Sequence, residues 1–112
     1  DGPGAEEEFR ALFRALHSPL PVTVRVSQQG PSCARTEAHL EAKGWARRHD
    51  FDGAGLSVWQ LDDDRYTAHD GCRGWTEREN RNGTLSFQEL VSMVPALLLA
   101  PQPGHLCLDM CA

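Results

Sequence analysis

Residues 22–26, VTVRV, alternate apolar and polar side chains and are mainly β-branched, which predicts a β-strand with one buried face. Residues 56–61, LSVWQL, alternate in the same way and predict a second strand. Residues 6–16, EEEFRALFRAL, predict an amphipathic helix, because their apolar side chains fall at i, i+3, i+4 and i+7: Phe9, Leu12, Phe13 and Leu16. These helical and extended segments in one short chain indicate an α+β fold.

The remaining segments predict further helices and one further strand. Residues 33–48 have a helical composition. Residues 62–82 are polar, contain glycine and show little periodicity, so we expect a long loop with one helical turn. Residues 85–100 predict another amphipathic helix. Residues 105–110, HLCLDM, predict a buried strand.

The length and charge of the chain limit its function. Its 112 residues fit one small domain, and its formal net charge is −5. This acidic balance argues against a protein that binds nucleic acid on its own, because such proteins usually present a basic face. It is compatible with one part of a larger RNA-binding enzyme. The acidic start GAEEEF predicts no signal peptide, and the longest apolar stretch, residues 94–100, is too short to cross a membrane.

The cysteine and histidine residues predict no metal site. The four cysteines include no C-x-x-C pair, which favours reduced thiols in an intracellular protein, with a disulfide or a zinc site as the alternative. The five histidines show no H-x-x-x-H or H-E-x-x-H spacing. We interpret the run Asp62, Asp63 and Asp64 as a solvated acidic surface, with magnesium binding as the alternative.

Residues 78–89, RENRNGTLSFQE, have the spacing of a calcium-binding EF-hand loop centred on Gly83. Arg78 stands where such a loop needs an aspartate, and its positive charge would repel the metal ion. We favour a turn followed by a helix that has Thr84 or Ser86 as its N-cap. The alternative function is a non-enzymatic interaction domain with a degenerate EF-hand-like loop, in which four residues match ligand positions: Asn80, Asn82, Ser86 and Glu89.

Residues 87–112, FQELVSMVPALLLAPQPGHLCLDMCA, contain two dense motifs. The helical motif consists of Gln88, Glu89, Val91, Ser92, Met93, Val94, Pro95, Leu97, Leu98 and Leu99. The strand motif consists of Leu106, Leu108, Asp109, Met110, Cys111 and Ala112. Both resemble motifs of the Sun-type (NOP/Sun) RNA (cytosine-5) methyltransferases, and the resemblance is closest to the eukaryotic tRNA-methylating branch. Residues 9–26, FRALFRALHSPLPVTVRV, also resemble the beginning of that family.

The resemblance implies a chain with two parts. Residues 1–82 would form a small N-terminal α+β domain on the substrate side, with two amphipathic helices and a short sheet. Residues 83–112 would form the lead-in helix and the first strand of a truncated Rossmann-like methyltransferase domain. Because the chain starts without Met and stops inside the predicted strand, we expect an N-terminal fragment.

The resemblance also implies the cofactor S-adenosyl-L-methionine. Its binding motif would begin at the end of the strand, with Asp109, Met110, Cys111 and Ala112. Gln88 and Ser92 of the lead-in helix would lie near the pocket. This motif is incomplete, and the family's catalytic cysteines and aspartate belong to later motifs. We therefore expect that this chain alone neither binds the methyl donor well nor methylates RNA.

RNA is the partner that the resemblance implies, and tRNA is the substrate of the closest branch. Five cations are candidates for contacts with the RNA backbone, and a solvated surface is their alternative interpretation: Arg25, Arg35, Lys43, Arg47 and Arg48. The resemblance implies an intracellular protein of the nucleus or nucleolus. The predicted strand at residues 105–111 would have a free edge, so we also expect self-association through it.

Overall fold

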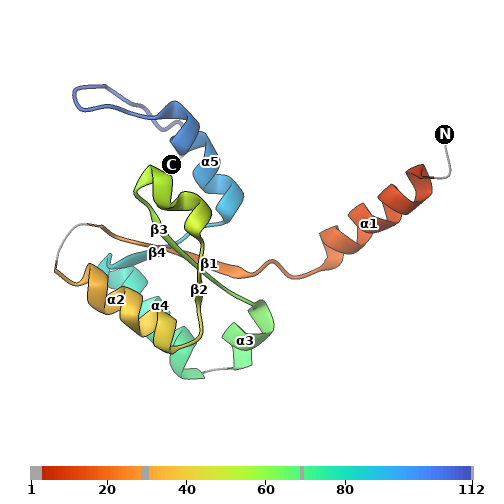
Figure 1. The fold of residues 1–112 in the computed structure, drawn as a ribbon, viewed down its shortest axis with the longest axis horizontal. Coiled ribbons are helices and arrows are strands. Elements are labelled where there is room, and N and C mark those ends of the chain that lie inside the picture. Colours follow the sequence, from red (N-terminus) through yellow and green to blue (C-terminus); the bar gives the residue numbers. More distant parts are fainter. Residues whose placement is uncertain (1–3, 29–30, 69, 112) are drawn as a thin grey trace.

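The computed structural model describes residues 4–28, 31–68 and 70–111, and its centre is a four-stranded antiparallel sheet (Figure 1). The order of the strands is β2-β3-β1-β4. Their bounds are β1 Val22–Val26, β2 Ala46–Arg47, β3 Ser57–Leu61 and β4 Leu85–Phe87. The two strands predicted from alternation are confirmed to within one residue, and they pair with each other, with Val24 opposite Trp59.

Helices cover both faces of this sheet. On one face, α2 (Cys33–Ala42), α3 (Asp63–Ala68) and α4 (Asp70–Asn82) contribute to the main core. The buried residues of this core are Val24, Val26, Leu40, Trp45, Trp59, Leu61, Tyr66, Cys72 and Leu85. On the other face, the short 3-10 helix η1 (His49–Ala54) and α5 (Leu90–Leu99) enclose a smaller cluster of Phe51, Val58 and Met93. This arrangement confirms the α+β class.

Helix α1 (Ala5–His17) confirms the predicted N-terminal helix. Three glutamates occupy its first turn, where the helix dipole favours negative charge. The helix extends away from the sheet (Figure 1), and none of its residues is buried. Its apolar face is therefore exposed in the described structure: Phe9, Leu12, Phe13 and Leu16.

The long loop predicted at residues 62–82 is wrong, because this segment forms α3 and α4. Glycines at positions 71 and 74 lower the local helix propensity by about 1 kcal/mol each, which misled the prediction. Tertiary packing outweighs that cost. Tyr66, Cys72 and Thr76 are buried against the sheet, and the Tyr66 and Thr76 hydroxyls lie 3.1 Å apart.

The helix predicted at residues 85–100 begins five residues later than expected, at Leu90. Residues 85–87 instead form β4, which pairs with β1 through Val26 opposite Leu85. Thr84 is not the N-cap. Its hydroxyl donates to the carboxylate of Glu79 at 2.6 Å, which closes the turn between α4 and β4. The N-cap residue of α5 is Glu89.

Two further predicted elements differ from the structure. The helix predicted at residues 33–48 ends at Ala42, because Gly44 adopts a φ of +82°, a left-handed conformation that stops the helix. Residues 105–109 form no strand, since no strand among the described residues lies beside them to supply hydrogen-bond partners. None of the described helices combines the length and the apolar composition that a membrane-spanning segment needs.

Candidate functional site

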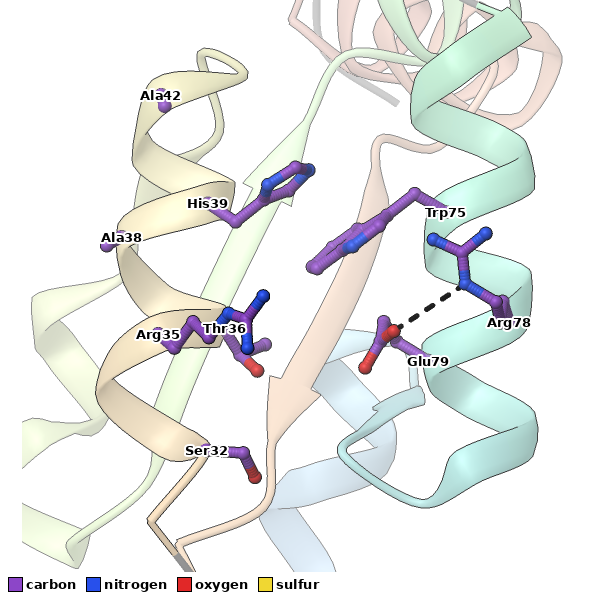
Figure 2. Close-up of a pocket in the computed structure, with 9 residues that line it drawn as sticks. All are labelled: Ser32, Arg35, Thr36, Ala38, His39, Ala42, Trp75, Arg78 and Glu79. Atoms are coloured by element: carbon purple, nitrogen blue, oxygen red, sulfur yellow. Dashed lines mark ion pairs between the residues drawn. The ribbon is translucent and has the colours of Figure 1, made fainter.

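A groove of about 650 Å³ lies between α2 and α4 (Figure 2). The α2 side contributes Ser32, Arg35, Thr36, Ala38, His39 and Ala42, and the α4 side contributes Trp75, Arg78 and Glu79. The two alanines leave space beside the larger side chains. The groove therefore combines aromatic rings, hydroxyl groups and charges of both signs, a composition that suits a polar ligand with a flat apolar part.

The imidazole of His39 stacks on the indole of Trp75 inside this groove (Figure 2). The ring centroids are 4.0 Å apart and the planes differ by 26°. The Nε2 atom of His39 is buried, and no hydrogen-bond partner for it is found among the described residues. A buried polar atom without a partner costs about 1–3 kcal/mol. The stacking contact with Trp75 helps to orient this ring.

The charges around His39 are mainly positive. Lys43, Arg35 and Arg78 lie close enough to affect its ionisation, whereas Glu79 is the one carboxylate that acts on it. The carboxylate of Glu79 is 3.8 Å from Nε of Arg78 and accepts a hydrogen bond from Thr84. Burial lowers the pKa of His39 below its ordinary value of 6.5, and Lys43 lowers it further. The ring is therefore neutral at pH 7.

The neutral state of His39 predicts a pH dependence of stability. Below pH 6.5 the unfolded chain protonates this imidazole more readily than the folded chain does. The contribution of neutral His39 to the free energy of unfolding is therefore complete above pH 6.5, and it is lost as the pH falls towards the lower pKa of the folded state. We expect the free energy of unfolding to fall more steeply in the original chain than in His39→Gln as the pH drops below 6.5. Urea unfolding measures the free energy of unfolding of both proteins at each pH. Parallel plots of this free energy against pH would contradict the prediction.

The structure does not bring the five predicted RNA-contacting cations to one surface. Arg35 lines the groove, and Lys43 lies near it at the end of α2. Arg47 is 3.0 Å from Asp52, and Arg48 is 2.8 Å from Asp50. The pKa of each of these two carboxyls is lowered mainly by hydrogen bonds, from Arg48 to Asp50 and from His49 and Arg47 to Asp52. Arg47 and Arg48 are therefore already engaged by carboxylates.

Arg25 lies on the opposite face of the sheet, where it is linked to α5. It stands opposite Val58, whose side chain belongs to the smaller cluster. Its Nε donates to Oε1 of Gln88 at 3.3 Å, and the amide nitrogen of Gln88 donates to the carbonyl oxygen of Ser92 at 3.4 Å. The structure thus connects one predicted RNA-contacting residue with both predicted pocket-lining residues, Gln88 and Ser92.

The predicted donor-binding residues lie in an exposed segment after α5. Asp109, Met110 and Cys111 are exposed, and Ala112 lies outside the described residues. An oxygen of Asp109 accepts the backbone N–H of Cys111 at 2.9 Å. This bond shapes a turn at the end of the segment. The part of the chain that the structure describes places no other predicted donor-binding residue in hydrogen-bond contact with this turn.

The residues of the EF-hand-like segment lie on different elements. Asn80 and Asn82 belong to the last turn of α4, whereas Glu89 follows β4 and precedes α5. Gly83 has a φ of +77° and makes the turn between α4 and β4. Within residues 4–28, 31–68 and 70–111, no group of three or more His, Cys, Asp and Glu side chains is placed to hold a metal ion. The segment therefore forms the end of a helix, a turn and a strand.

Arg35 is the one residue lining the groove that was predicted from the sequence as a binding residue, and the sequence did not identify three side chains that are central to the groove: His39, Trp75 and Arg78. A signal was present in the spacing of Cys72, Trp75, Thr76 and Glu79, which fits i, i+3, i+4 and i+7 of a helix. Assignment of residues 62–82 to a loop concealed it. No sequence pattern placed this helix beside α2, because the groove arises from the packing of both helices on the sheet.

The chain is distantly similar to a tRNA methyltransferase of known activity. The chain is 28% identical to the multisite-specific tRNA:(cytosine-C(5))-methyltransferase of Saccharomyces cerevisiae over an alignment 131 residues long. The alignment covers 96% of this chain and 18% of the yeast protein. The chain thus spans less than a fifth of the relative's length. No protein-family model matches the chain, and no solved structure matches it. The alignment supports a distant relationship to that methyltransferase.

Proposed function

We propose that this chain is the N-terminal part of an S-adenosylmethionine-dependent RNA cytosine-5 methyltransferase that acts on tRNA. The alignment with the yeast enzyme over 96% of the chain carries the proposal. The motifs within residues 87–112 support the Sun-type branch, because they combine an uncommon Ser-Met-Val-Pro sequence with the sequence Asp-Met-Cys-Ala. A nuclear or nucleolar location belongs to the same proposal.

The proposal divides the chain into a substrate-side part, residues 1–82, and a part that leads into a Rossmann-like catalytic domain, residues 83–112. Exposed apolar side chains support the second assignment, because isolated soluble proteins rarely expose many such groups together. They lie on α5 and in the segment that follows it: Val91, Val94, Leu98, Leu99, Leu106, Leu108 and Met110. Further parts of a longer protein would cover them, and a neighbouring strand would order residues 105–110.

The methyl donor would supply the transferred methyl group, and residues of this chain would bind part of the donor molecule. Asp109 would accept hydrogen bonds from the donor, and Gln88 and Ser92 would line the approach. The contact of Gln88 with Arg25 supports a fixed placement of α5 on the substrate-side sheet. Because Asp109 to Ala112 form only the start of the motif, the chain alone would bind the donor weakly and would not methylate RNA.

The test uses the longest product of the gene that contains these residues. We expect it to bind S-adenosylmethionine in calorimetry and to transfer tritiated methyl groups to cytosine C5 of tRNA. Asp109→Ala should weaken donor binding by about tenfold or more, because a hydrogen bond to a charged group contributes about 1.5–3 kcal/mol. Asp62→Ala, which changes an exposed aspartate between β3 and α3, is the matched control. A longer protein that binds no donor would rule the function out.

A further inference from the structure

Trp75 differs from the other two tryptophans of the chain. The indole N–H groups of Trp45 and Trp59 donate to Sγ of Cys72 and to Oγ of Ser57, and both rings are buried. Trp75 is half-buried at the groove, and no hydrogen-bond acceptor for its indole N–H is found among the described residues. Part of its surface and a hydrogen-bond donor are therefore left for a ligand.

His39 adds a second unused polar group at the same place. Its Nε2 has no partner among the described residues, although its ring packs on Trp75. The imidazole lines the groove, and its Nε2 lies beside the space that a ligand would enter. A ligand that offers an acceptor or donor there would remove the penalty of an unsatisfied buried atom.

The cations of the groove are better exposed than its carboxylate. The side chain of Arg78 is 59% exposed, whereas that of Glu79 is 18% exposed and is held by the hydroxyl of Thr84. No carboxylate lies within ion-pair distance of Arg35 among the residues that the structure describes. In a chain whose net charge is −5, this opening thus presents mainly positive charge.

We infer that the groove between α2 and α4 binds single-stranded RNA, with Arg35 and Arg78 on a phosphate and with Trp75 and His39 against an unpaired base. The inference rests on the proposed function and assigns a place for its RNA. Single-stranded nucleic acids are bound by cations that follow the backbone and by aromatic rings that contact bases. Both kinds of group meet here (Figure 2).

The first experiment measures how RNA affinity depends on salt. A fluorescein-labelled single-stranded oligoribonucleotide is titrated with the longest product of the gene that contains these residues, at several potassium chloride concentrations. In Arg35→Ala/Arg78→Ala we expect binding to weaken by about tenfold or more. The slope of log K against log salt should become shallower by about 0.7 for each RNA phosphate that the variant no longer neutralises. The matched control is Arg10→Ala/Arg73→Ala, which removes the same charge from two exposed arginines outside the groove.

The second experiment separates base stacking from charge. Trp75→Leu should weaken RNA binding by about tenfold, because base stacking contributes about 1–3 kcal/mol, while the salt slope stays unchanged. Trp75→Phe, which keeps an aromatic ring, should recover part of the affinity. Circular dichroism confirms that each variant is folded. Inorganic phosphate at the same concentration as the RNA phosphates should not compete.

The outcomes separate this inference from the proposed function. If the groove and control double variants weaken RNA binding equally and show equal slopes, the groove is not the RNA site. Displacement by inorganic phosphate, or tighter binding of an acidic peptide than of RNA, would also overturn the inference. In the longer protein, the groove variants should raise the KM for tRNA without changing S-adenosylmethionine binding. Methyl transfer with an unchanged KM for tRNA would show that the groove is not the RNA site, and the proposed function would still hold.

Discussion

Replacement of Leu85 by alanine should lower the free energy of unfolding by about 2–5 kcal/mol, the range observed when a buried leucine is truncated. Leu85 is 0% exposed. It stands opposite Val26 in the pairing of β4 with β1 and belongs to the main core. The change removes apolar packing and leaves a cavity that the flanking strand and helices cannot fill completely. Urea unfolding followed by circular dichroism measures the loss of stability.

Val91→Ala is the control for this prediction. Val91 belongs to the same C-terminal region but is 73% exposed on α5. Its truncation should change the free energy of unfolding by no more than about 0.5 kcal/mol. The comparison tests the placement of β4 directly, because in a helix that started at Leu85 this leucine would lie in an exposed first turn. Equal effects of the two substitutions would contradict the pairing of β4 with β1.

Tyr66→Ala should cost about 3–5 kcal/mol, since truncation of a buried aromatic side chain removes a large share of the packing in a small core. Tyr66 is 9% exposed. Its ring contacts Trp45 edge-to-face at 6.1 Å between centroids and Phe87 at 6.3 Å. Tyr66 therefore links α3 to Phe87 of β4 and to Trp45, which directly precedes β2. Chemical unfolding monitored by tryptophan fluorescence provides the measurement.

Tyr66→Phe separates the contribution of the aromatic ring to stability from that of the hydroxyl group. This substitution keeps the aromatic packing and removes only the hydrogen bond between the hydroxyls of Tyr66 and Thr76. Thr76 keeps its bonds to the carbonyl oxygens of Cys72 and Arg73, so no buried group loses its last partner. We expect a cost of about 0.5–1.5 kcal/mol. If Tyr66→Ala cost no more than Tyr66→Phe, residues 62–82 would behave as the loop that the sequence predicted.

Local sequence patterns were sufficient to predict a helix or strand when its two faces differ strongly in polarity. The alternation in residues 22–26 reports the burial of Val24 and Val26 towards the main core. The spacing of Phe9, Leu12 and Phe13 likewise predicts α1, although the described structure leaves that apolar face uncovered. In both cases the conformation follows from the order of side chains within a few residues.

The candidate site was predicted only in part, because its residues come from two helices. Arg35 and Lys43 were named from their charge, and they lie at the groove or beside it. Trp75 and Arg78 were missed, since the glycine-containing segment around them has weak helix propensity. Its helical state depends on the burial of Cys72 and Thr76 against the sheet, a long-range interaction that no short window of sequence contains.

The amino-acid order alone was enough to identify the α+β class, β1, β3 and α1, because local periodicity reflects which side of each element is buried. Tertiary packing decided the rest. Residues 85–87 form a strand because their backbone pairs with β1, a strand far earlier in the chain. The groove exists because that sheet holds α2 and α4 side by side (Figure 2). Interactions between distant segments supply the energy that outweighs local propensity, and they also bring the aromatic and basic groups together.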